Sequence, residues 1–151
     1  MKNKIKLVVT LCLILVVMTA CGTAASKKAG LTCTELQAKL VEMNLTDKDS
    51  VTNITNEDGQ EAFGCLTKTF WVVAFVDFGN DTAGCDEEMK LWIEDLKPVA
   101  DKPEKNLQVY EQDSQDAYLV FSRVGNTLMM VSGVKKDKAE MLNILQTLGY
   151  Y

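Results

Sequence analysis

The five cysteines are the residues of this chain with the most varied chemistry, because the sequence contains no histidine. A thiolate can form a disulfide, accept a lipid, bind a metal or act as a nucleophile. The lack of histidine excludes His-based catalytic triads, HExxH metal sites and C2H2 zinc fingers. The chain also contains no CxxC pair and no GxSxG, SxxK, P-loop or GxGxxG motif. We therefore expect no enzymatic activity, no catalytic residue, no metal ligand and no cofactor.

Cys21 follows a segment with the layout of a secretory signal. Three lysines within the first six residues precede an apolar stretch over residues 7–18 and then small residues. About twelve apolar residues are fewer than the roughly 20 that a membrane-spanning helix needs. The sequence Met18-Thr19-Ala20-Cys21 resembles the lipobox of bacterial lipoproteins, with methionine where leucine is usual. The resemblance implies that Cys21 carries palmitate-type acyl chains and becomes the first residue of the mature chain.

The resemblance divides the chain into three parts. Residues 1–20 are expected to be a cleaved signal peptide, residues 21–31 a lipidated cysteine with a flexible tether, and residues 32–151 a single domain. A small, polar tether of this length reaches on the order of 17 Å, and two acyl chains are enough for stable binding to a bilayer. We expect a protein that is lipid-anchored to the cell membrane and faces the extracytoplasmic side.

The charge of the mature chain limits its partners. Loss of the three lysines of the signal peptide changes the net charge from −5 to −8. An acidic domain lacks the basic face that nucleic acid requires, and it favours cationic partners. Besides the bilayer itself, we predict an envelope or secreted protein as the partner and no nucleic acid.

Periodicity predicts an α+β domain. Apolar residues at helical spacing indicate three helices, near residues 33–44, 85–98 and 137–148. Thr32 with Glu35 and Asp137 with Glu140 have the spacing of capping boxes. Five strands are expected: residues 51–55, a second strand that contains Cys65 and runs through Phe70–Val76, and a meander over 107–111, 118–123 and 127–134, preceded by a linker at 100–105.

These elements predict the architecture of the domain. We expect a five-stranded, mainly antiparallel sheet with about three helices packed on one face, in the order α-β-β-α-β-β-β-α. The ending Leu148-Gly149-Tyr150-Tyr151, after a Gly-Asn-Thr hairpin, resembles a loose class of small, mostly uncharacterised lipoproteins of Gram-positive-type bacteria. That class implies no known active site.

Cys33, Cys65 and Cys85 remain in the mature domain, in a compartment that permits disulfides. The first helix is expected to run parallel to the second strand, which places Cys33 and Cys65 near the same hairpin bend. Cys85 belongs to a helix that is expected to start at the opposite end of the sheet. We predict a disulfide between Cys33 and Cys65, with Cys85 as a free, buried thiol.

The candidate binding surface consists of Trp71, Phe75 and Tyr118. Trp71 and Phe75 share a parity on a strand that is apolar on both faces, so they are candidates for an exposed aromatic platform on the face away from the helices. The alternative is that other segments cover this face. A second cluster, Asp77, Asn80, Asp81 and Asp86, has the oxygen ligands that calcium takes, although such residues more often end a strand and cap a helix.

These observations favour a non-enzymatic, membrane-anchored binding or interaction domain at the cell envelope. Its binding surface is expected on the helix-free face of the sheet or along a sheet edge. Two alternatives stay open: a carboxylate-dependent envelope hydrolase and a purely structural lipoprotein.

Overall fold

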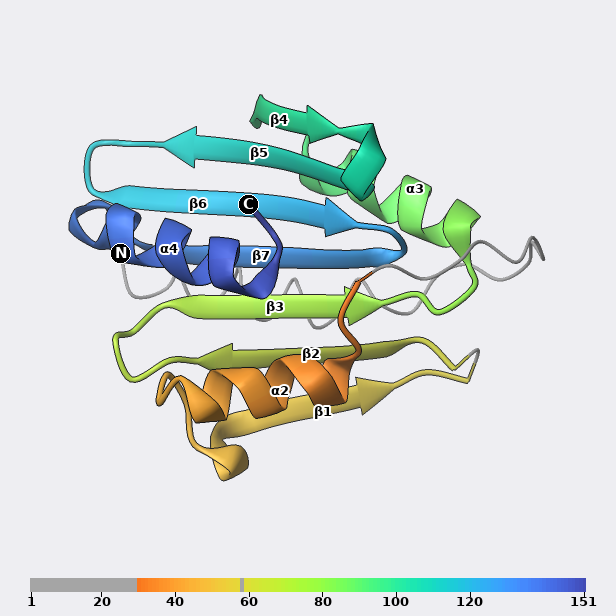
Figure 1. Ribbon diagram of the computed structural model, residues 1–151, viewed down its shortest axis with the longest axis horizontal. Helices are drawn as coiled ribbons and strands as arrows, with labels where there is room; N and C mark the ends of the chain where they lie inside the picture. Colours follow the sequence, from red (N-terminus) through yellow and green to blue (C-terminus); the bar gives the residue numbers. More distant parts are fainter. Residues whose placement is uncertain (1–29, 58) are drawn as a thin grey trace.

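The computed structural model describes residues 30–57 and 59–151, which form one antiparallel sheet with helices on both faces. The seven strands lie in the order β1-β2-β3-β7-β6-β5-β4 (Figure 1). Their bounds are β1 Val51–Thr55, β2 Glu61–Leu66, β3 Val72–Asp77, β4 Lys97–Lys102, β5 Leu107–Asp113, β6 Ala117–Val124 and β7 Thr127–Val134. The described helices are α2 Cys33–Glu42, α3 Thr82–Trp92 and α4 Lys138–Leu148, with short 3-10 turns at Lys48–Ser50, Pro103–Lys105 and Lys135–Asp137.

The sheet consists of two meanders joined at its centre. Strands β1 to β3 form one meander and β4 to β7 the other, and β3 pairs antiparallel with β7. Helix α3 connects the end of β3 to β4 at the far edge of the sheet (Figure 1). The α+β class, the three helices and the antiparallel sheet were therefore predicted correctly, whereas the number and order of strands were not.

Two strands were missed for different reasons. The segment that was predicted as one strand through Cys65 and Phe70–Val76 is two strands, because the chain turns between them and Phe70 adopts a left-handed φ of 64°. Strand β4 lies half where the end of the second helix was predicted, residues 97–99, and half where a linker was predicted, residues 100–102. The helix ends earlier, at Trp92, and the charged, half-exposed sequence of β4 gives no clear apolar alternation. The element order in the described part is α-β-β-β-α-β-β-β-β-α.

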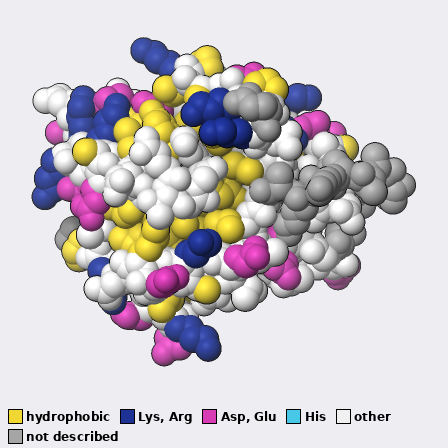
Figure 2. Space-filling view, in the orientation of Figure 1, with side chains coloured by type: hydrophobic (Ala, Val, Ile, Leu, Met, Phe, Trp, Pro, Cys, Tyr) yellow, Lys and Arg dark blue, Asp and Glu magenta, His cyan; other side chains and the backbone are white. Residues whose placement is uncertain are grey.

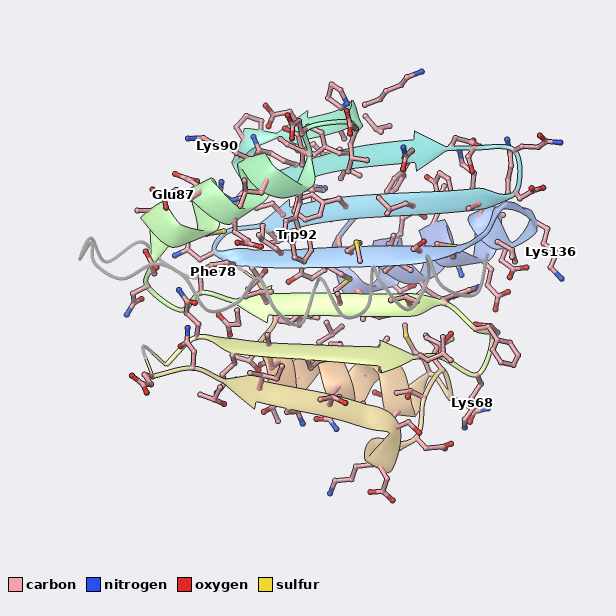
Figure 3. All side chains as sticks on the ribbon, turned by 180° about the vertical axis from the view of Figure 1, so that it is seen from behind. Lys68, Phe78, Glu87, Lys90, Trp92 and Lys136 are labelled. Atoms are coloured by element: carbon pink, nitrogen blue, oxygen red, sulfur yellow. The ribbon has the colours of Figure 1, made fainter. Side chains whose placement is uncertain are left out.

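The helices do not share one face of the sheet, as was predicted. Helices α2 and α4 cover one face, and the helix α3 covers part of the other (Figures 1 and 3). The sequence of β3 explains why both faces need cover, since Val73 and Phe75 point to the first face and Ala74 and Val76 to the second. Figure 2 shows apolar side chains gathered over the middle of the first face, with charged side chains around them. We call these the α2/α4 face and the α3 face.

The helix ends follow the capping signals in part. Thr32 and Glu35 form the predicted capping box of α2, with both reciprocal hydrogen bonds present. Asp137 does not cap α4; its carboxylate instead accepts a hydrogen bond from the indole Nε1 of Trp71, at 3.1 Å. The second capping box was therefore predicted wrongly, because a core side chain competes for the aspartate.

The predicted disulfide is wrong, because Cys33 and Cys65 are thiols near opposite ends of α2. The thiol of Cys65 bonds to Thr46, which follows the C-terminal end of this helix. Cys33 begins the helix, near Tyr150. A helix of this length spans about 15 Å, whereas a disulfide needs Cα atoms within about 7 Å. The missed turn before β3 is the cause, because it puts Cys65 at the far end of a short strand.

Candidate functional site

The predicted aromatic platform is part of the core. Trp71, Phe75 and Tyr118 are 2%, 0% and 0% exposed and lie in the apolar cluster under α2 and α4. Phe75 contacts the rings of Phe63 and Tyr150 at centroid distances of 5.7 and 6.1 Å. The face that these residues occupy is covered by two helices. The prediction of an exposed aromatic platform is therefore wrong, and the alternative, that other segments cover this face, is correct.

A polar cluster surrounds the outer end of this core. The Tyr151 hydroxyl donates to Glu111 Oε1 at 2.8 Å, and Lys138 Nζ lies 4.3 Å from the centre of the Tyr118 ring. The buried Tyr118 hydroxyl makes no hydrogen bond to the described residues. Burial and the neighbouring Glu111 carboxylate raise the pKa of Tyr118, and the same two causes raise the pKa of Tyr151 to about 12. Both tyrosines are therefore neutral at physiological pH, and the cluster closes the core.

The acidic residues after β3 serve the local backbone. Asp81 caps α3 by accepting from the Gly84 amide at 2.9 Å, and it accepts from Gln60 Nε2 at 3.1 Å. Asp77 accepts from the Gly79 amide at 2.9 Å. No group of three or more potential metal ligands occurs among the described residues. The turn-and-cap interpretation accounts for these side chains.

In the part of the chain that the structure describes, the edge formed by β1 is open. Its five residues, Val51–Thr55, pair with β2 and with no other described strand, and the pairing runs without a register shift. The strand carries no proline and no lysine, and its side chains are exposed or half-buried. In an edge strand the outward N–H and C=O groups are left for another chain to pair with. Four of the five residues are β-branched, which suits an added strand.

The opposite edge, β4, is blunted. Its register against β5 shifts between Pro98 and Ala100, and Lys97 and Lys102 stand at its two ends. Proline removes a backbone donor, and a bulge and lysines discourage pairing with another strand. The described part of the sheet therefore has one edge suited to strand addition and one edge protected against it (Figure 1).

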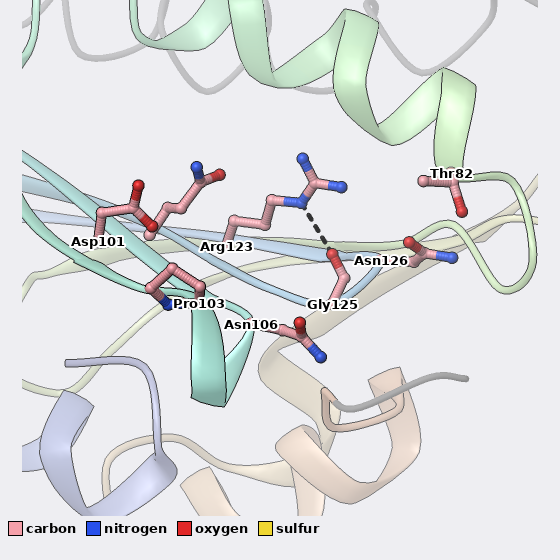
Figure 4. Close-up of a pocket in the computed structure, with 8 residues that line it drawn as sticks. Thr82, Asp101, Pro103, Asn106, Arg123, Gly125 and Asn126 are labelled. Carbon is pink, nitrogen blue, oxygen red and sulfur yellow. Dashed lines mark hydrogen bonds between the residues drawn. The ribbon is translucent and has the colours of Figure 1, made fainter. Parts of the chain in front are cut away.

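A polar cavity of about 250 Å³ lies on the α3 face, between the start of α3 and the strands β4 to β6. It is lined by Thr82, Asp101, Pro103, Asn106, Gln108, Arg123, Gly125 and Asn126 (Figure 4). Asn106 ends the 3-10 turn after β4 in a left-handed conformation, φ 50°, and its carbonyl accepts from the Gly125 amide at 3.1 Å. This contact fixes the two turns that form one wall of the cavity.

Arg123, which is the only arginine of the chain, is held rigidly in this cavity. Its Nε donates to the Gly125 carbonyl at 2.8 Å, and its Nη1 forms an ion pair with Asp86 on α3. Nη1 also lies 3.6 Å from the sulfur of Met89. The guanidinium therefore joins the sheet to α3, and its Nη2 has no hydrogen-bond acceptor among the described residues.

Cys85 lies in the apolar cluster beneath α3 and is a fully buried thiol. Burial raises the pKa of Cys85 to about 12, and the nearby Arg123 guanidinium offsets this only in part. A thiol that is protonated and enclosed in this way does not act as a nucleophile at neutral pH.

Comparison of the chain with protein-family models, with curated proteins and with solved structures finds no match. The candidate sites are therefore defined by the geometry and chemistry of this chain.

The sequence analysis named neither the cavity nor β1 as a site, although it allowed for a sheet edge. One feature of the sequence could have pointed to Arg123. Every second residue of β6 lies on the same face, and in the series Leu119, Phe121, Arg123 the arginine stands where an apolar residue is expected. A cation on an apolar parity needs a polar partner. The other cavity residues come from turns whose mutual position the sequence pattern does not contain.

Proposed function

We propose that this chain is a lipid-anchored, non-enzymatic domain of the cell envelope, which binds a protein partner by strand addition along β1. The observation that carries the proposal is the difference between the two sheet edges, because β1 is the edge without proline, lysine or bulge. Strand addition gives affinity through main-chain hydrogen bonds and specificity through alternate side chains.

The charges around β1 indicate the partner's chemistry. Asp49 precedes the strand, Glu57 follows it, and Glu61 of β2 lies opposite Thr55. Asp47 is also nearby, although it forms an ion pair with Lys68 at 2.9 Å. Lys48 and Lys68 balance Asp47 and Asp49 at the Val51 end, so the excess of acid lies at the Thr55 end, with Glu57 and Glu61. The partner segment is therefore extended, rich in β-branched residues and basic at the end that meets Glu57 and Glu61, and charge attraction increases its rate of association.

The anchor is supported by the lipobox-like sequence that ends at Cys21. The described helices include none that is long and apolar enough to cross a bilayer. Gly30 packs against Thr127 and Val124, so the tether joins the domain at the sheet end that carries the β6–β7 turn. Strand β1 forms one edge of the sheet (Figure 1), and we propose that a partner reaches it beside the membrane.

Lipidation is tested with Cys21→Ser in the full-length chain, expressed in a bacterium that processes lipoproteins. We expect mass spectrometry to find a diacylglycerol on Cys21 of the native chain and none on the serine variant, which should keep residues 1–20. Cys12→Ser is the matched control, because it changes a cysteine within the signal peptide and should be lipidated like the native chain. Absence of the diacylglycerol from Cys21 of the native chain would contradict the anchor and leave the edge proposal untouched.

Strand addition is tested by photo-crosslinking in the anchored protein. A benzophenone side chain at Thr55 of β1 is expected to form an adduct with one extended segment of a partner, whereas the same probe at the exposed Val99 of β4 is not. The segment, made as a synthetic peptide, should bind the purified protein. Equal adducts from both edges, or a peptide that does not bind, would contradict the proposal.

Proline in β1 provides the blocking variant. Neighbouring residues of an edge strand direct their N–H groups alternately toward the sheet and away from it. One of the two variants Thr52→Pro and Asn53→Pro therefore removes an outward N–H group and leaves the pairing with β2 intact, while the other disrupts it. The variant that keeps the wild-type melting temperature is the one to use. It should lose the Thr55 adduct, and an undiminished adduct would contradict main-chain pairing along β1.

A further inference from the structure

We propose that the cavity around Arg123 binds a neutral polyhydroxylated ring, that is, a single sugar residue. The cavity lies on the α3 face and takes no part in the strand addition proposed above, so the two proposals stand or fall separately. Three properties of the cavity carry the inference: its polar groups that have no protein partner among the described residues, its charge and its size.

Four polar side chains of the lining have hydrogen-bonding capacity left over. The Asp101 carboxylate and the side-chain amides of Asn106 and Gln108 make no hydrogen bond or ion pair with the described residues, and neither does Nη2 of Arg123. They come from β4, the turn before β5, β5 itself and β6, and all four residues line the same cavity. A site with this many uncommitted groups suits a ligand with several polar atoms of its own.

The balance of donors and acceptors matches hydroxyl groups. Asp101 only accepts, Arg123 Nη2 only donates, and each amide of Asn106 and Gln108 does both. A hydroxyl also donates and accepts, so neighbouring hydroxyls on a ring can satisfy such a mixed set. Planar carboxylate and amide groups hold two adjacent hydroxyls at once.

The charge of the cavity argues against an anionic ligand. Arg123 is already paired with Asp86, and Asp101 adds a second carboxylate at the wall. Two of the three guanidinium nitrogens are committed, which leaves no two-pronged site for a carboxylate or a phosphate. A neutral ligand therefore fits the electrostatics better than an anion does.

The size of the cavity limits the ligand to one ring. Its volume of about 250 Å³ is below the range of roughly 300–1,000 Å³ that is typical of drug-sized ligands. The cavity includes Gly125 and Asn126, next to the end of the sheet where Gly30 packs. Sugars at this end of an anchored domain come from two sources, free or polymer-bound glycans and the headgroups of glycolipids.

The test is saturation-transfer NMR on the mature, lipidated chain in nanodiscs, with glucose and N-acetylglucosamine as probes. We expect a transfer signal from at least one of these sugars and none from alanine or inorganic phosphate. Nanodiscs that contain a glucosyl-diacylglycerol identify the source, because a bound headgroup would compete with the free sugar. No sugar signal, or a signal confined to alanine or phosphate, would overturn the proposal.

Two variants locate the binding. Asn106→Gly keeps the left-handed backbone and removes only the amide, and Gln108→Ala removes a second amide from the wall. Each is expected to weaken sugar binding roughly tenfold, the effect of one lost hydrogen bond of about 1.4 kcal/mol. Gln112→Ala, on the same strand but outside the cavity, is the matched control. Unchanged affinity in both cavity variants would overturn the assignment even if the sugars bind.

Discussion

The two faces of the sheet differ in the size of their side chains and in how completely they are closed. The α2/α4 face packs large rings under two helices, and these rings include Phe63, Trp71, Phe75, Tyr118 and Tyr150. The α3 face packs two buried phenylalanines, Phe78 and Phe121, among smaller or more flexible residues such as Ala62, Ala74, Cys85 and Met89, under a single described helix. The second tryptophan of the chain, Trp92, lies on the α3 face and is only half-buried (Figure 3).

This difference explains where polar chemistry is found. The α2/α4 face is covered by two helices, and its ion pairs lie at the perimeter, around Glu111 and Lys138. On the α3 face, which has one described helix, Arg123 lies beside a cavity. The face with less helix cover among the described residues is therefore the one with capacity for a small ligand.

The largest expected effect compares the two tryptophans of the chain, one on each face. Trp71→Ala should lower the free energy of unfolding by about 3–5 kcal/mol, since it empties a buried site and leaves Asp137 without its indole donor. Trp92→Ala should cost less, roughly 1–3 kcal/mol, because this ring is half-exposed and packs mainly on Phe121, at 5.1 Å. Urea unfolding measures both, and equal losses would contradict the difference between the faces.

Most of the element types were predictable from the sequence, and the failures have a local cause. The capping box at Thr32 and the meander of β5 to β7 follow from short-range patterns. The turn at Thr67–Phe70 lacks glycine and proline and contains a phenylalanine in a left-handed conformation, so its sequence does not mark it. Because this turn was missed, β2 and β3 were predicted as one strand, and Cys65 was predicted near the wrong end of α2.

The candidate sites were less predictable, because they depend on which residues become neighbours. Trp71 and Phe75 share one face of the sheet, as their parity indicated, but that face lies under α2 and α4 and not away from the helices, because parity does not specify which face the helices cover. The β3 sequence, apolar on both parities, pointed to cover on both sides. Arg123 was not predicted, although its position on the apolar parity of β6 could have marked it, whereas Asn106 and Asp101 meet it only through the order β6-β5-β4.

Alkaline pH should reduce stability, with a contribution from a buried thiol on each face. Burial raises the pKa of Cys85 from 9.0 to about 12 and that of Cys65 to about 11. Below pH 9 both thiols are protonated in the folded and the unfolded chain; above it the unfolded thiols ionise first, so the free energy of unfolding falls as pH rises toward the folded pKa values. The free energy of unfolding should fall most steeply with pH in wild type, less steeply in Cys65→Ala, and least steeply in Cys85→Ala. Urea unfolding at a series of pH values above 9 measures it, and identical pH profiles would contradict the assignment.

A methyl group added to the α2/α4 face should be poorly tolerated at Gly133. A Cβ at this position on β7 would lie 2.6 Å from Cδ1 of Trp71 and 3.2 Å from the sulfur of Met141. Gly133→Ala should therefore destabilise the fold by about 1–3 kcal/mol, the usual cost of overpacking a core. Thermal unfolding measures the loss. The combined variant Gly133→Ala with Met141→Ala would show whether room for the Trp71 ring restores part of it.

The same methyl group should be accepted at Gly64 on the α3 face. Gly64 lies on β2 opposite Ala74, its φ is not left-handed, and a Cβ there would meet only the Val73 carbonyl oxygen, at 3.8 Å. Alanine restricts the unfolded chain more than glycine does, so Gly64→Ala should stabilise the fold by about 0.5 kcal/mol. Because Gly64 also pairs with Thr52, a firmer β2 should hold β1 in place without blocking its outer edge. Opposite signs for Gly64→Ala and Gly133→Ala would establish that the two faces differ in packing density, and a destabilised Gly64→Ala would mean that the α3 face is as tightly filled as the other.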